Sequence, residues 1–144
     1  MIYFDTACLV KCYLDERGSD AVRKLAAASS RIACCSYGRL ELAATLYRNF
    51  CEGKISQAQR KVLFQQMDLD DSNPIWTWLP VTAELLADTT ARLSILRPTL
   101  HLRAADALHL ACAAGHGFEK IFSNDRHLLR AAAACKIKGC NVIA

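Results

Sequence analysis

The chain has 144 residues, of which 53% are hydrophobic, and this size and apolar content suit one globular domain with a single core. Its 18 Lys and Arg residues outnumber its 14 Asp and Glu residues, and the net charge of +4 fits a polyanionic partner and an ordinary basic surface equally well. No apolar run reaches the roughly 20 residues that a membrane-spanning helix needs, which argues against a membrane protein.

The eight cysteines include no C-x-x-C pair, and most of them lie within apolar stretches. The sequence also lacks the cationic and apolar segments of a secretory signal. We therefore expect a cytoplasmic protein whose thiols are reduced and act as small buried hydrophobic groups.

In the first half of the chain, short apolar segments alternate with segments of helical periodicity. The order is a strand at 2–4, helices at 7–16 and 19–29, a strand at 31–35, and helices at 39–50 and 56–67. Ser56 can cap the last of these helices. The polar cluster DLDDSNP at 68–74 predicts a solvated loop.

The same alternation continues in the second half. The order is a strand at 75–79, a helix that Thr82 can cap and that runs to Leu96, a helix at 102–115, a strand at 120–123, a helix at 125–135 and a strand at 141–143. Strands that alternate with helices across short connections predict a parallel sheet covered by helices. No linker or repeat divides residues 1–144, so we expect one domain.

Two aspartates lie just after predicted strands. Asp5 ends the first strand, and Asp125 comes after the strand at 120–123. Ligands of an open parallel sheet bind beyond the carboxyl ends of its strands. Asp125 has a structural alternative, because Asp is also a preferred helix cap.

Two further acids stand in apolar surroundings. Asp106 interrupts the segment LRAADALHLACAA, where an unpaired carboxylate is costly, although a pair with Arg103 would make it merely structural. Glu41 lies in a helical segment, where an exposed face is the alternative. Carboxylates gathered near one edge of a sheet would repel one another unless a divalent cation neutralised them. On this reasoning, removing the charge of Glu41 would leave the metal-free protein as stable as wild type or more stable.

Four segments carry a resemblance to a known family: MIYFDTACLVKCYLDE, RLELAATLYR, LRAADALHLACAAGHGFEKIFSNDRHLLRAA and the closing strand. They resemble a PIN domain, in particular the toxin ribonucleases of VapC type. The resemblance implies a three-layer α/β fold with a five-stranded parallel sheet, in the order 3-2-1-4-5, flanked by helices.

The resemblance also implies a site. Its catalytic residues are Asp5, Glu41, Asp106 and Asp125. Asp5, Asp106 and Asp125 would bind Mg²⁺ or Mn²⁺, because carboxylate oxygens are better ligands for these ions than for zinc. Ser123 would support the site with its hydroxyl, and Thr6 would orient Asp5. Apart from the resemblance, Arg126 and Arg130 could contact substrate phosphates next to the site, although a role in surface solubility is an equal alternative.

The implied function is metal-dependent hydrolysis of RNA phosphodiester bonds by the toxin of a type II toxin–antitoxin system. The resemblance also implies an antitoxin partner, whose C-terminal segment would lie across the acidic groove. It implies a homodimer as well. The alternative is a catalytically inactive PIN-like module that binds RNA or a protein. Such modules usually lose acidic positions, and this chain keeps all four.

Two other enzyme classes fit poorly. A nucleotide-binding dehydrogenase would need G-x-G-x-x-G after the first strand, where this chain has DTACLV. A haloacid-dehalogenase-type phosphatase would need D-x-D-x-T, and position 7 is Ala. His109 could be a ligand or a proton carrier beside Asp106, but packing is the favoured reading, because oxygen-based metal binding needs no imidazole.

Overall fold

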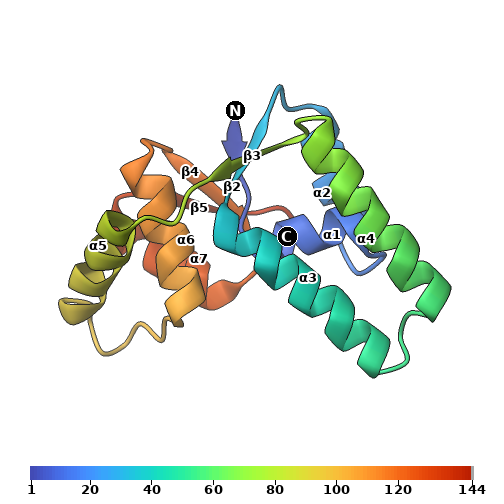
Figure 1. The fold of residues 1–144 in the computed structure, drawn as a ribbon. Helices are drawn as coiled ribbons and strands as arrows, with labels where there is room; N and C mark the ends of the chain where they lie inside the picture. Colours follow the sequence, from blue (N-terminus) through green and yellow to red (C-terminus); the bar gives the residue numbers. More distant parts are fainter. Residues whose placement is uncertain (144) are drawn as a thin grey trace.

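The computed structural model describes residues 1–143, which form a three-layer α/β structure (Figure 1). The strands are β1 (Ile2–Tyr3), β2 (Ile32–Cys35), β3 (Trp76–Leu79), β4 (Lys120–Ser123) and β5 (Lys138–Asn141). The helices are α1 (Thr6–Tyr13), α2 (Ser19–Ala27), α3 (Ser36–Cys51), α4 (Gln57–Ser72), α5 (Ala83–Ser94), α6 (Ala104–Gly115), α7 (Arg126–Ala132) and the 3-10 helix η1 (Ala133–Cys135). None of the helices in this part of the chain has the length and apolar character of a membrane span.

The strands pair into two parallel sheets, not into the single five-stranded sheet that the sequence predicts. One sheet has the order β1-β2-β3 and the other pairs β4 with β5. A single parallel bridge between Phe4 and Phe122 joins them, and the Asp5 amide donates to the Phe122 carbonyl at 3.1 Å. The spatial order is therefore 3-2-1-4-5, as predicted, but β1 is too short to pair with β4 along its length. β5 lies ahead of the strand predicted at 141–143 and shares only Asn141 with it.

The predicted loop at 68–74 is also wrong, because α4 continues to Ser72. Asp68 and Asp71 on its last turns both form salt bridges with Arg39 of α3. The acidic cluster therefore joins two helices, and the turn that follows it is shorter than its composition suggests.

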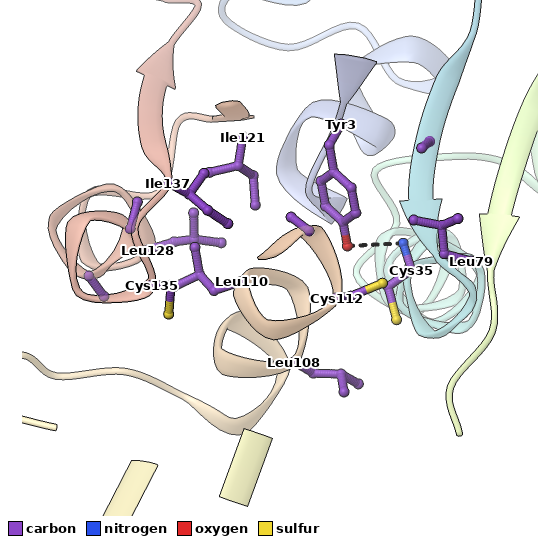
Figure 2. Close-up of a cluster of buried hydrophobic side chains, with 14 residues drawn as sticks. Tyr3, Cys35, Leu79, Leu108, Leu110, Cys112, Ile121, Leu128, Cys135 and Ile137 are labelled. Atoms are coloured by element: carbon purple, nitrogen blue, oxygen red, sulfur yellow. Dashed lines mark hydrogen bonds between the residues drawn. The ribbon is translucent and has the colours of Figure 1, made fainter. Parts of the chain in front are cut away.

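Side chains alternate across the strands and divide the core into two clusters. Tyr3 and Cys35 face α6 and α7, whereas Phe4 and Cys34 face α1 and α3. Figure 2 shows the first cluster, in which Leu110 of α6 lies among Ile121 of β4, Leu128 of α7 and Ile137, the residue before β5. Helices thus cover both faces of the sheets.

Side-chain caps fix the start of several helices. The Ser56 hydroxyl accepts a hydrogen bond from the Gln59 amide, and the Gln59 side chain accepts one from the Ser56 amide. The Thr82 hydroxyl accepts a hydrogen bond from the Leu85 amide at 3.1 Å and caps α5, without a reciprocal bond. Both predicted caps are confirmed.

Candidate active site

A cleft of about 370 Å³ opens where the carboxyl ends of β1 and β4 meet α1, α3, α6 and α7. All four acidic residues proposed from the sequence line it: Asp5, Glu41, Asp106 and Asp125. Each comes from a different segment of the chain, so it is the fold that gathers them. Their roles as ligands and catalysts stay a prediction.

Asp5 is buried at the base of this cleft, with 3% of its surface exposed. Its Oδ1 accepts a hydrogen bond from the Cys8 amide at 3.0 Å and caps α1, while its Oδ2 accepts one from the Ser123 hydroxyl. Burial raises the pKa of Asp5 to about 6, although both hydrogen bonds act to lower it. A carboxyl perturbed in this way within a cleft is a candidate functional group.

Ser123 connects Asp5 to Asp125. Its hydroxyl donates to Asp5 and accepts a hydrogen bond from the Asp125 amide at 2.9 Å. The Oδ1 of Asp125 accepts bonds from the amides of His127 and Leu128, at 2.7 and 3.0 Å, so Asp125 does cap α7. Its Oδ2 receives no hydrogen bond from residues 1–143, and capping is therefore compatible with a role in the cleft.

Asp106 lies in the first turn of α6 and is half-buried. Burial raises its pKa, and the charges of Asp125 and Glu41 raise it further. Arg103 lines the same cleft, yet the described residues show no salt bridge between it and Asp106. The pairing that would make Asp106 merely structural is not observed.

Glu41 on α3 is held by two polar side chains. Its Oε2 lies 2.5 Å from the Thr6 Oγ1 and 2.9 Å from the His109 Nε2. Burial would raise the pKa of Glu41, but the hydrogen bonds from His109 and Thr6 outweigh it and keep the pKa below its ordinary value. Glu41 is therefore ionised at neutral pH. The Thr6 hydroxyl, expected to orient Asp5, is bound to Glu41 instead.

The chemistry of these groups fits a hard divalent cation. Carboxylate oxygens face the cleft from four sides, and such oxygens are preferred by Mg²⁺ and Mn²⁺. Across residues 1–143, however, no three His, Cys, Asp or Glu side chains are grouped tightly enough to hold a metal ion. The effect of Asp125 and Glu41 on the Asp106 pKa shows that these charges repel one another. A cation would relieve this repulsion and favour a closer grouping.

Three basic residues also line the cleft: Lys11, Arg48 and Arg103. The sequence pointed to Arg103 only as a possible partner of Asp106, and it did not single out the other two. Lys11 is 5% exposed, and its Nζ lies 2.6 Å from the Oε2 of Glu16. A lysine within the apolar run ACLVKCYL, six positions after Asp5, was the signal that could have identified it.

The two arginines proposed as substrate contacts do not line this cleft. Arg130 lines a separate hollow of about 520 Å³ together with Arg92 and Arg97. Arg126 begins α7 and is exposed. Their placement gives no support to direct contact with a phosphate at the acidic site.

Solved structures of similar fold cover nearly the whole chain. FitAcB from Neisseria gonorrhoeae has a TM-score of 0.78 at 16% identity, over 99% of this chain and 98% of that one. VapC20 from Mycobacterium tuberculosis, described as a toxin that cleaves the sarcin–ricin loop, has a TM-score of 0.73 at 15% identity, over 96% and 99%. VapBC2 from Rickettsia felis, bound to a promoter DNA fragment, has a TM-score of 0.66 at 17% identity, over 98% of both chains.

Such low identities establish a shared fold only. No curated protein matches the sequence. The family model described as the PIN domain, however, matches residues 2–134, which is nearly the full length. This chain therefore belongs to the PIN domain family.

Proposed function

We propose that this protein is a metal-dependent endoribonuclease that hydrolyses RNA phosphodiester bonds, as the toxin of a type II toxin–antitoxin system. The observation that carries the proposal is the meeting of four carboxylates from four segments in one cleft, where burial and the neighbouring carboxylates raise the pKa of Asp106. PIN domains are in general nucleases, and the similar VapC20 is named as a toxin that cleaves the sarcin–ricin loop.

Asp5, Asp106 and Asp125 would hold Mg²⁺ or Mn²⁺. When bound, such an ion polarises the phosphate, activates a water and stabilises the leaving oxygen. Ser123 fixes the orientation of Asp5 through its hydrogen bond. Glu41, whose pKa lies below its ordinary value, remains available to accept a hydrogen bond from the attacking water.

The exposed basic side chains would hold the RNA backbone. Arg48 and Arg103 are exposed and line the same cleft as the carboxylates, whereas Lys11 is buried and paired with Glu16. Contacts of this kind position a strand without reading its sequence. RNA affinity should therefore fall steeply with salt, as expected when phosphates are neutralised.

The test is cleavage of end-labelled structured RNA by purified protein, with Mg²⁺, with Mn²⁺ and with excess EDTA. We expect cleavage only with metal, and at least about a hundredfold loss in folded Asp5→Asn and Asp106→Asn variants, because each removes a charge that stabilises the transition state. Asp20→Asn, on the exposed surface of α2, is the matched control and should cleave like wild type. Undiminished cleavage in EDTA would remove the metal mechanism.

The alternative is a PIN-like module that binds RNA or protein without cutting. The observation that favours it is the absence, within the described residues, of three side chains close enough to hold a metal. This module would bind RNA equally well with EDTA and with Mg²⁺ and would never shorten it. Gel shift and cleavage assays on the same samples separate the two functions.

The proposal includes an antitoxin partner, because the similar VapBC2 structure is a complex of this kind of pair. A groove of about 720 Å³ between α1, α3 and α4 offers an apolar surface that includes Leu14, Val62 and Leu63. Glu16 lines both this groove and the acidic cleft, so a segment bound in the groove would reach the site.

Co-purification with the product of the neighbouring gene tests the partner. Val62→Glu should disrupt the complex, whereas Leu69→Glu should not, because Leu69 is exposed on the same helix but lies outside the groove. We further propose a homodimer and a cytoplasmic location. The eight free cysteines fit a reducing compartment, and sedimentation analysis tests the dimer.

A further inference from the structure

His109 is buried in the wall of the acidic cleft and has polar partners on both ring nitrogens. Its imidazole is 2% exposed. The Nε2 lies 2.9 Å from the Glu41 Oε2 and 2.9 Å from the Thr6 Oγ1, and the Nδ1 lies 3.0 Å from the Tyr3 hydroxyl. An imidazole with this set of partners does more than fill space.

The partners determine which atom carries a hydrogen. The Glu41 carboxylate can only accept, and the single Thr6 hydroxyl hydrogen is directed at the same carboxylate oxygen. The Nε2 of His109 therefore faces two acceptors and must carry a hydrogen. Tyr3 can partner Nδ1 in either protonation state of the ring, because a hydroxyl both donates and accepts.

Tyr3 is itself fixed within the core. It is fully buried, and its hydroxyl accepts a hydrogen bond from the Cys35 amide at 3.1 Å, the dashed line in Figure 2. Its ring packs edge-on against Phe118, with 5.4 Å between centroids. The chain of contacts from the Cys35 amide through Tyr3 to His109 thus rests on β1 and β2, which are rigid elements.

Gly38 allows α3 to approach this group. A Cβ at position 38 would lie 2.5 Å from the Cys34 Sγ and 3.3 Å from both the His109 Cε1 and the Thr6 Oγ1. Glu41 follows three positions later on the same helix. The close approach of α3 brings the Glu41 carboxylate within reach of His109.

We propose that His109 is a positioning residue, which holds the Glu41 Oε2 so that Glu41 presents its other oxygen to the ion and water of the cleft. The inference rests on the proposed function. Oε1 receives no hydrogen bond from residues 1–143, whereas Oε2 is held by both Thr6 and His109. A glutamate fixed before the ligand arrives loses less rotamer freedom on binding, and this support strengthens the site.

Isothermal calorimetry with Mn²⁺ tests the role without RNA or turnover. His109→Leu removes the donor while retaining an apolar side chain, and we expect Mn²⁺ affinity to fall about ten- to a hundredfold, the range typical of residues behind a metal site. His109→Gln restores an N–H donor and should recover most of the affinity. Tyr3→Phe keeps the ring but removes the hydroxyl that contacts His109. It should therefore also lower the Mn²⁺ affinity.

A double-mutant cycle shows whether His109 acts through Glu41. In a Glu41→Gln background, His109→Leu should change Mn²⁺ affinity by less than about twofold, because the group that it positions is already altered. Near-UV circular dichroism on each variant verifies folding. If His109→Leu does not fold, Tyr3→Phe takes its place in the cycle, because it removes the partner of the His109 Nδ1 and leaves the imidazole intact.

Three results overturn the proposal in distinguishable ways. If wild type binds Mn²⁺ and cleaves RNA but folded His109→Leu and Tyr3→Phe bind Mn²⁺ as well as wild type, the positioning role is wrong and the nuclease stands. If wild type neither binds Mn²⁺ nor cleaves RNA, the proposed function fails and the positioning role fails with it. An undiminished effect of His109→Leu in the Glu41→Gln background would show that His109 acts by another route.

Discussion

The Ser123 hydroxyl donates a hydrogen bond to the Asp5 carboxylate, although 118 positions separate the two residues. The bond joins the carboxyl end of β4 to that of β1, next to the only backbone bridge between the two sheets in the described part of the chain. It therefore ties the two sheets together at the place where the acidic cleft opens.

Removing this hydroxyl should cost stability as well as activity. Ser123→Ala would leave two partners of the hydroxyl, the Asp5 Oδ2 and the Asp125 amide, without their bond in a buried site. We expect the free energy of unfolding in urea to fall by about 1–3 kcal/mol. Ser123→Thr keeps the hydroxyl and should lose less. Equal losses for the two variants would mean that packing, not the hydrogen bond, matters there.

The raised pKa of Asp5 predicts a pH-dependent stability in EDTA. The pKa is about 6 in the folded protein and about 3.9 in an unfolded chain. Because the folded state holds the proton more tightly, the stabilising contribution is fully present below pH 4 and is lost as the pH rises through 6. The loss is on the order of 2–3 kcal/mol.

Asp5→Asn cannot titrate and should not show this loss. Urea unfolding of both proteins should be measured from pH 4 to pH 7 in EDTA. The free energy of unfolding of Asp5→Asn, minus that of wild type, should increase as the pH rises. Two parallel stability curves would show that Asp5 has an ordinary pKa, and its place as a perturbed group in the site would be wrong.

Gly38 offers a test of the packing behind Glu41. Gly38→Ala places a Cβ against the Cys34 sulfur, so we expect destabilisation of about 1–3 kcal/mol and a weakened hold on Glu41. Gly115→Ala, also in a helix, meets nothing within 4 Å and should be neutral or stabilising by up to about 1 kcal/mol. Thermal melts of the two variants compare them directly. A neutral Gly38→Ala would mean that α3 can move aside.

The positions of Asp5 and Asp125 could be predicted because they depend on a simple rule, whereas Glu41 and Asp106 were assigned to the site only by the family resemblance. A residue just after a parallel strand lies at the carboxyl edge of the sheet, and this places Asp5 and Asp125. Capping by Asp125 was also foreseeable, since Asp commonly begins helices. These features are local in sequence, so periodicity and residue type reveal them.

The contacts around the acids could not be predicted, because they join residues far apart in sequence. His109 and Tyr3 are 106 positions apart, and nothing in either neighbourhood indicates the other. Thr6 follows Asp5 directly, yet its hydroxyl turns to Glu41. The predicted loop at 68–74 failed for a related reason, because Arg39 of a different helix stabilises its acids within α4.

The structure also changes what we expect when one acid is neutralised. The sequence suggested that Glu41→Gln would relieve repulsion, but Glu41 receives two hydrogen bonds that favour its charged form and lower its pKa. The ionised form of Asp106 is the one that is destabilised, because burial and the acidic neighbours of Asp106 raise its pKa. Neutralising these two residues should therefore have opposite effects on the metal-free protein.

In EDTA at pH 7, Asp106→Asn should raise the free energy of unfolding by about 0.5–1 kcal/mol, as substitutions that remove a destabilising functional group often do. Glu41→Gln should lower it by about 1 kcal/mol, because two hydrogen bonds to a charged group are weakened. Adding Mg²⁺ should stabilise wild type by mass action and Asp106→Asn much less, so that wild type becomes the more stable of the two. Thermal melts of the three proteins with and without Mg²⁺ measure all of these differences. If Asp106→Asn is destabilising in EDTA and Mg²⁺ raises every melting temperature equally, then Asp106 is a structural residue and the acidic cleft does not bind the ion.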